Sequence, residues 1–175
     1  MMYTQPVYMI GTYNEDGTPD VMNAAWAGIS GSDKVTICVD KGHRTTENLL
    51  ARKAFTLSPG VERYVKECDY LGLVSGYDVP DKVVKAGFHT KKSEKVDAPI
   101  VEEFPMVLEC KVVSYDSETE VLVGQIVDVL ADESVLTDGN VDPEKLHPIT
   151  YDPCMHRYYS LGRNVGQAFS VGKNL

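Results

Sequence analysis

The chain lacks the two glycine-rich motifs that mark the commonest nucleotide-binding folds. No Gly-x-Gly-x-x-Gly follows its first predicted strand, and no Gly-x-x-x-x-Gly-Lys-Ser/Thr occurs anywhere in its 175 residues. The first absence argues against a Rossmann dinucleotide fold, and the second argues against a P-loop. A nucleotide cofactor bound by this chain would therefore need a different kind of cradle.

Long apolar runs and paired cysteines are missing as well. No apolar run reaches the roughly eighteen residues of a membrane span, and the first ten residues lack the basic flank and apolar stretch of a signal peptide. The four cysteines at 38, 68, 110 and 154 include no Cys-x-x-Cys pair, so neither a zinc site nor a disulfide framework is indicated. We expect reduced thiols, no metal, no membrane contact and a cytoplasmic location.

Basic residues are scarce. The chain has 17 Lys and Arg against 26 Asp and Glu, giving a formal net charge of −9. Nucleic-acid binding depends on basic patches that replace counterions, and anionic membranes repel such a chain, so both partners are excluded. An acidic chain that binds phosphate must gather cations locally, which draws attention to Lys41, His43 and Arg44. Size and composition are those of one globular domain spanning residues 1–175.

What the sequence does contain is a series of short strand-like runs. Residues 7–13 and 20–29 flank Asn14-Glu15-Asp16-Gly17, a hairpin signal in which Gly17 can take positive φ. The predicted strands cover residues 7–13, 20–29, 34–39, 54–57, 106–115 and 121–131. Helices are few and short: we predict 44–52, capped by Thr45 or Thr46, then 62–68 and 82–86. Many short strands without a βαβ rhythm favour a mostly antiparallel barrel.

Two runs suit a flat, phosphorylated ligand. Residues 23–30, Asn-Ala-Ala-Trp-Ala-Gly-Ile-Ser, have small side chains that let a ring lie against backbone N–H groups. Residues 43–48, His-Arg-Thr-Thr-Glu-Asn, stand at a predicted helix start, where free amides and the helix dipole favour an anion. Together they indicate a mononucleotide cofactor. Taken alone, the first run also fits a buried strand with a core tryptophan, and the second a solvated helix start.

These runs, with further pieces in the same order, resemble the flavin reductase-like family, which includes the flavoredoxins. The supporting pieces are Ile10-Gly11-Thr12, residues 15–19, Gly72-Leu73-Val74-Ser75-Gly76, Lys82, Ala98-Pro99-Ile100, residues 108–111 and residues 158–162. The resemblance implies a mostly β, antiparallel Greek-key split β-barrel with a few flanking short helices. It also implies a homodimer that holds flavin mononucleotide (FMN) near the subunit interface.

The resemblance further implies a set of cofactor-binding residues. They are Asn23, Ala24, Ala25, Trp26, Ser30, His43, Arg44, Thr45, Asn48, Lys82 and Phe169. Relatives place an Arg where this chain has His43, with Arg44 one position later, so either side chain could hold the phosphate. Lys82 is expected to point its charge into the pocket. Phe169 could lie near the ring, cover it from the partner subunit, or belong to the dimer core.

The function implied is that of an FMN-dependent oxidoreductase. NADH or NADPH would pass a hydride to the flavin N5, and electrons would go on to a small-molecule or protein acceptor. Such transfer needs no protein acid or base, so no catalytic residue is named. The main alternative is a flavoredoxin-type electron carrier without nicotinamide-dependent activity. Two others are a split barrel holding pyridoxal phosphate or haem, and a dimeric interaction module without cofactor.

Overall fold

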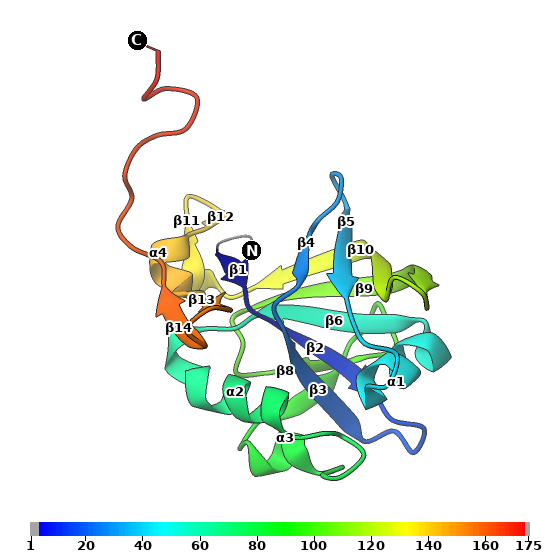
Figure 1. Ribbon diagram of the computed structural model, residues 1–175. Helices are drawn as coiled ribbons and strands as arrows, with labels where there is room; N and C mark the ends of the chain where they lie inside the picture. The colour runs from blue at the N-terminus through cyan, green and yellow to red at the C-terminus, as the bar shows by residue number, and fades with distance from the viewer. Residues whose placement is uncertain (1–3, 174–175) are drawn as a thin grey trace.

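A computed structural model describes residues 4–173, and its centre is a seven-stranded antiparallel sheet (Figure 1). The spatial order is β3-β2-β6-β9-β10-β5-β4. The strands are β2 (Tyr8–Tyr13), β3 (Pro19–Ala24), β4 (Ala27–Ile29), β5 (Lys34–Cys38), β6 (Ala54–Pro59), β9 (Met106–Asp116) and β10 (Val121–Ala131). The longest pair, β9 and β10, carries two register shifts that increase local twist.

The sheet curls into a split barrel because of one short connection. Strands β3 and β4 lie at opposite edges of the sheet, yet only Ala25 and Trp26 separate them in sequence. Two residues span only about 7 Å, so the two edges must approach each other. The N–H of Cys38 on β5 donates to the carbonyl of Trp26 at 2.8 Å and fixes this corner.

Smaller elements surround the barrel (Figure 1). A second sheet joins β1 (Gln5–Pro6), β13 (Ile149–Asp152) and β14 (Arg157–Ser160). Two hairpins are β7 (Thr90–Lys92) with β8 (Pro99–Val101), and β11 (Leu136–Thr137) with β12 (Asn140–Val141). The helices are α1 (Arg44–Arg52), α2 (Val65–Leu73), α3 (Lys82–Lys85) and α4 (Pro143–Leu146), with 3-10 turns at Glu62–Tyr64 and Glu133–Val135. Within residues 4–173, no helix is long and apolar enough to cross a membrane.

The apolar core fills the barrel and the space beneath α2. Phe55 and Leu122 lie in the barrel, and a Cβ on Gly124 would stand 2.5 Å from the Phe55 ring, so this crossing requires glycine. Burial raises the pKa of the thiols of Cys68 and Cys110 to about 12. These two residues therefore behave as small apolar core residues rather than as reactive thiols.

Most predicted elements are confirmed, and three details are corrected. Helix α1 has the predicted bounds, and Gly17 has a φ of 84° in the predicted hairpin. The strand expected over 20–29 is broken at the barrel corner, because the chain passes there from one sheet edge to the other. The helix expected over 62–68 begins as a 3-10 turn and continues to Leu73.

The third correction concerns the cap of α1. The N-cap is His43, not Thr45 or Thr46, and its side chain makes no capping hydrogen bond. The Thr45 hydroxyl donates to Asp20, and the Thr46 hydroxyl donates to the carbonyl of Asp40. Both threonines thus connect the helix to neighbouring segments instead of satisfying its first-turn amides.

Candidate functional site

A cleft with two connected hollows runs along the outer side of β3. The wide hollow, about 420 Å³, lies at the barrel corner, and the narrow hollow, about 270 Å³, lies at the start of α1. Both are lined by Met22, Asn23, His43, Gly72 and Leu73. The wide hollow alone falls within the usual size of cofactor sites, about 300–1,000 Å³.

The narrow end offers backbone donors. It is lined by the first turn of α1 and by the segment Val74–Gly76, which follows α2. Among residues 4–173, the N–H groups of Arg44, Thr45, Ser75 and Gly76 donate to no recorded acceptor. Free amides at a helix start, together with the helix dipole, favour a bound anion.

A buried ion pair forms the back of the narrow end. Lys82 Nζ lies 3.1 Å from Asp20 Oδ1, and these two side chains are only 3% and 2% exposed. Asp20 Oδ2 also accepts a hydrogen bond from the Thr45 hydroxyl at 2.6 Å, and Lys82 Nζ donates to the Val74 carbonyl at 3.3 Å. The pair therefore ties together β3, α1, α3 and the segment after α2. The Asp20 carboxylate also offsets the positive charge that Lys82 places at the cleft wall.

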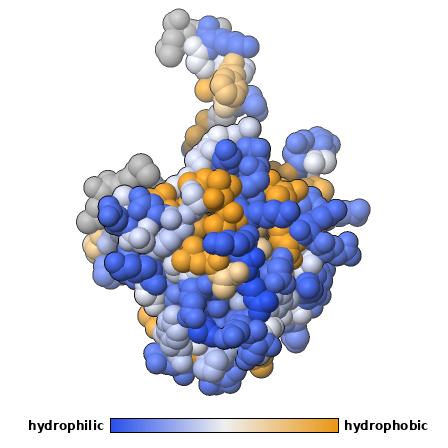
Figure 2. All heavy atoms as spheres, turned by 90° about the vertical axis from the view of Figure 1, so that its right-hand side faces the viewer, coloured by the Kyte–Doolittle hydropathy of each residue, from blue (hydrophilic) through white to orange (hydrophobic). Residues whose placement is uncertain are grey.

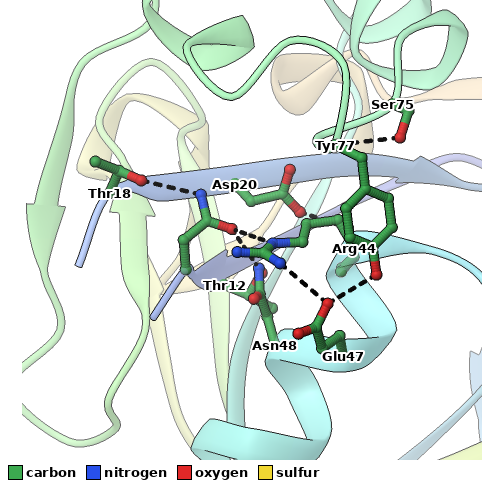
Figure 3. Close-up of polar contacts among 10 residues, drawn as sticks. Thr12, Thr18, Asp20, Arg44, Glu47, Asn48, Ser75 and Tyr77 are labelled. Atoms are coloured by element: carbon green, nitrogen blue, oxygen red, sulfur yellow. Dashed lines mark hydrogen bonds and ion pairs between the residues drawn. The ribbon is translucent and has the colours of Figure 1, made fainter. Parts of the chain in front are cut away.

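Arg44 is held in a surface network beside this pair (Figure 3). Its Nε donates to Asn14 Oδ1 at 3.1 Å, and its guanidinium lies 3.0 Å from Glu47 Oε2. The guanidinium also lies over the Tyr77 ring at 5.3 Å, and the Tyr77 hydroxyl donates to the same Glu47 oxygen at 2.7 Å. The hydrogen bond to Glu47 raises the pKa of Tyr77, and it lowers the pKa of Glu47. The network holds the segment around Tyr77 against α1.

Two glycines permit the close packing of this wall. A Cβ on Gly76 would stand 2.5 Å from Asp20 Oδ1 and 3.2 Å from the Arg44 side chain. A Cβ on Gly72 would stand 3.0 Å from the Asn23 Cβ. The chain can therefore pass directly over the ion pair, and α2 can pack directly onto β3, only because side chains are absent at these positions.

The wide end is aromatic and open. Trp26 is 56% exposed, and its ring centroid lies 6.4 Å from that of Tyr151. Tyr158, His156 and Cys38 complete this part of the lining. Burial, followed by the hydrogen bond that the Tyr158 hydroxyl donates to Asp69 at 2.9 Å, raises the pKa of Tyr158. Flat rings of this kind can pack against a planar ligand.

Asn23 supports the cleft from within. Its Nδ2 donates to the Cys68 carbonyl at 3.0 Å and to the Tyr158 hydroxyl at 3.3 Å. The side chain thus joins β3 to α2 and β14, and its amide nitrogen is engaged by the protein itself. Ala24 and Ala25 expose little side chain, so a ligand at this wall would meet mainly backbone.

Eight of the eleven predicted site residues line the cleft. Asn23, Ala24, Ala25 and Trp26 line the wide hollow, Arg44, Thr45 and Lys82 line the narrow one, and Asn23 and His43 border both. The core position considered for Trp26 is wrong, because its side chain is more than half exposed. Whether His43 or Arg44 contacts a phosphate stays a prediction, although the Arg44 guanidinium already has protein partners.

The other three residues lie elsewhere. Ser30 is in the turn between β4 and β5, where its Oγ accepts from Thr36. Asn48 is on the buried side of α1, and its Nδ2 donates to Thr12 Oγ1 and Asn14 Oδ1 (Figure 3). Phe169 is 99% exposed in the C-terminal segment, which extends away from the body (Figure 1). Within one chain, none of the three lines either hollow.

Sequence reasoning missed the wall supplied by residues 151–158 and by Asp69. Residues 151–158 lie more than 120 positions from β3 and Asp69 lies on α2, and only tertiary packing brings them together. The cluster of aromatic residues at Tyr151, Tyr158 and Tyr159 is the one signal that could have suggested a ring-binding wall. No group of His, Cys, Asp and Glu within the described residues is arranged to hold a metal ion.

Comparison with known proteins assigns the chain to a family. The model of the flavin reductase-like domain matches residues 1–154. The chain belongs to the flavin reductase-like family. A solved flavoredoxin of Desulfovibrio vulgaris (Miyazaki F) is 38% identical, with a TM-score of 0.94 over 99% of this chain and 95% of that one. A flavoredoxin from Methanosarcina acetivorans is 27% identical, with a TM-score of 0.91 over 99% and 94%.

A more distant solved structure shares the fold, and a further relative matches in sequence. An FMN-binding domain of flavin reductase-like enzymes from Shewanella baltica superposes with a TM-score of 0.84 at 19% identity, covering 93% of this chain and 89% of that one. The uncharacterized protein YdfE of Bacillus subtilis is 26% identical over 97% of this chain and 89% of its own length. The split barrel with few short helices is thus the fold of this family, and its cofactor is a flavin.

The residues present fit such a cofactor. The narrow end has unpartnered amides at a helix start for an anionic group, and the wide end has small side chains and exposed rings for a flat one. Because the two hollows share a wall, one elongated ligand with a ring and a charged tail could occupy both.

Proposed function

We propose that this member of the family binds FMN and acts as an oxidoreductase that accepts electrons from NADH or NADPH. The observation that carries the proposal is the pairing of an anion-accepting narrow end with an open, aromatic wide end in one cleft. An FMN molecule has the same division, with a phosphate at one end and a planar ring system at the other. The family resemblance supports the flavin, and the shape of the cleft supports the monophosphate.

The chain's own groups would bind the phosphate mostly with neutral donors. The amides of Arg44, Thr45, Ser75 and Gly76 donate to no recorded acceptor within residues 4–173. Lys82 stands behind them with its charge balanced by Asp20. Such a site tolerates a dianion in an acidic protein without a cluster of free cations.

The wide end would orient the ring and leave one side of it accessible. Backbone along Ala24 and Ala25 would meet the ring edge, and Trp26 would lie beside it. When bound, FMN supplies the hydride-accepting N5 and the redox chemistry. The protein's tasks are to hold the ring edge, exclude water from one side and admit a second planar substrate from the other. None of these tasks requires a proton donor or acceptor from the protein.

We also infer that the protein acts as a homodimer, in the cytoplasm. Apolar side chains are exposed on the paired strands β9 and β10, namely Val113, Val127, Val129 and Leu130. Exposed apolar surface of this kind is a common mark of an interface. Cys38, Cys68 and Cys110 are free thiols, as expected in a reducing compartment.

A second candidate function is that of an electron carrier without nicotinamide-dependent activity. It is favoured by the similarity to two solved flavoredoxins, one of which is 38% identical to this chain. In that case a protein partner would deliver and remove the electrons at the open wide end.

One experiment tests binding and separates the two functions. The purified protein is examined by visible spectroscopy with and without added FMN, and NADH or NADPH oxidation is then followed with FMN present. We expect a protein-bound absorbance band near ~450 nm and steady nicotinamide oxidation. A bound flavin with no oxidation would favour the carrier, and a protein that binds no flavin would contradict both.

A further inference from the structure

A third hollow of about 350 Å³ lies beyond the narrow end of the cleft, on the other side of Arg44. Its lining comes from β2, the turn after β2 and α1, and includes Glu15, Glu47 and Arg52. Among the described residues, Arg44 alone borders both this hollow and the narrow one. The Arg44 side chain therefore marks the place where the cleft ends.

Three neighbours hold the Arg44 side chain in this position. Its Nε donates to Asn14 Oδ1 at 3.1 Å, and Asn14 is only 4% exposed. Its Nη1 donates to Glu47 Oε2 at 3.0 Å. Its guanidinium lies 5.3 Å from the centre of the Tyr77 ring, and the Tyr77 hydroxyl donates to the same Glu47 oxygen at 2.7 Å. Arg44, Glu47 and Tyr77 thus fix one another, and we call these three residues the partition (Figure 3).

The two sides of the partition differ in what they offer a phosphate. On the narrow side, four backbone N–H groups have no recorded acceptor in the described chain. On the far side, the carboxylates of Glu15 and Glu47 line the third hollow. The cations there are already engaged, because Arg44 pairs with Glu47 and Arg52 pairs with Asp97 at 3.3 Å. A second phosphate beyond the partition would therefore meet like charges, which is unfavourable.

The surface around the third hollow also offers little to an adenine ring. Figure 2 looks at the side of the molecule on which α1 and the β2–β3 turn lie in Figure 1, and the lower half of that face is mainly hydrophilic. Planar heterocycles bind best in pockets lined mainly by apolar and aromatic side chains. The phosphate of a flavin can thus end at the partition, but a longer tail finds neither favourable charge nor favourable packing beyond it.

We propose that Arg44, Glu47 and Tyr77 limit the flavin tail to a single terminal phosphate, so that the cleft takes FMN and excludes FAD. FMN and FAD share the ring, the ribityl chain and the first phosphate, so only protein groups beyond that phosphate can distinguish them. Glu47 and Tyr77 act through Arg44 and are positioning residues. The inference rests on the proposed binding of FMN and adds the residues that reject the longer dinucleotide.

The dissociation constants of FMN and FAD for the full chain test the proposal, measured by ultrafiltration and the absorbance of the free flavin. The unsubstituted protein should bind FMN at least about tenfold more tightly than FAD, because the second phosphate meets like charge. In the double variant Glu47→Gln with Tyr77→Ala, the ratio of the two constants should fall at least about fivefold. Both side chains are more than half exposed, so the variant should fold normally.

Asp81→Asn is the matched control, because it also removes one exposed carboxylate that pairs with a cation, Lys85, at 2.9 Å. It should change the ratio by less than about twofold. A merely structural effect of the double variant would weaken both flavins alike and leave the ratio unchanged, which would overturn the proposal. Equal affinities of the unsubstituted protein for FMN and FAD, or a control that acts like the double variant, would also overturn it. Binding of neither flavin would instead overturn the proposed function, on which this inference rests.

Discussion

The narrow and wide ends of the cleft are built from opposite kinds of side chain. At the narrow end, Asp20, Lys82 and Thr45 are buried, Asp20 is bonded to each of the other two, and Gly76 passes over Asp20 within contact distance. At the wide end, Trp26 is 56% exposed and Leu73 is 75% exposed. The difference indicates a fixed anchor for a charged group at one end and an open platform for exchange of substrates at the other.

The comparison predicts that stability depends on the narrow end. Asp20→Ala leaves the Lys82 charge buried without an anionic partner, so we expect a loss of about 3–5 kcal/mol in unfolding free energy. The double variant Asp20→Leu with Lys82→Met removes both charges and should recover most of that loss. Denaturant unfolding of the unsubstituted protein, the single variant and the double variant measures these differences in unfolding free energy. A small effect of Asp20→Ala would show that the pair is not part of the anchor.

The next largest effect is expected at Gly76. In Gly76→Ala the added Cβ must displace Asp20 or Arg44, which should cost about 1–3 kcal/mol and weaken FMN binding at the same time. Gly28→Ala is the control, because a Cβ there meets nothing within 4 Å. Thermal unfolding without FMN measures the loss of stability, and the added stabilisation with FMN present measures the loss of binding. Equal behaviour of the two variants would mean that the wall after α2 is not tightly packed.

At the wide end, a substitution should weaken FMN binding while leaving the stability of the protein almost unchanged. Trp26→Ala should change the unfolding free energy by less than about 0.5 kcal/mol, because the side chain is largely exposed. Loss of its ring contact should weaken FMN binding by about 0.5–1.5 kcal/mol. Fluorescence titration with FMN, beside denaturant unfolding, checks the pair of results. A large loss of stability with unchanged binding would place Trp26 in the core after all.

The thiols should show the smallest effects. Cys38 borders the open wide end, so it should react with a thiol reagent at pH 8, and Cys38→Ser should remove the labelling of that position. Cys68 and Cys110 have pKa values raised by burial to about 12, against about 9 when unfolded. Their contribution to stability is complete below pH 9 and is lost as pH rises towards 12. Unfolding measured from pH 8 to 11 should show this decline; a rise would contradict the assignment.

The sequence predicted the local elements better than the partners of individual side chains. Helix α1 and strands β9 and β10 follow from periodicity and turn residues, which act over a few positions. Lys82 was expected to direct its charge into the pocket, yet it pairs with Asp20, 62 positions away. Asn23 was expected among the cofactor-binding residues; it lines the cleft, and its side-chain amide donates to the Cys68 carbonyl and the Tyr158 hydroxyl. Such pairings depend on how distant segments pack, and no local pattern encodes them.

The central claim is that the narrow end receives the phosphate of the cofactor. Fluorescence titration of the protein with FMN and with riboflavin, which lacks only the phosphate, tests it most directly. We predict that FMN binds at least about tenfold more tightly, since hydrogen bonds to a charged group contribute about 1.5–3 kcal/mol. Equal affinities for FMN and riboflavin would contradict the claim.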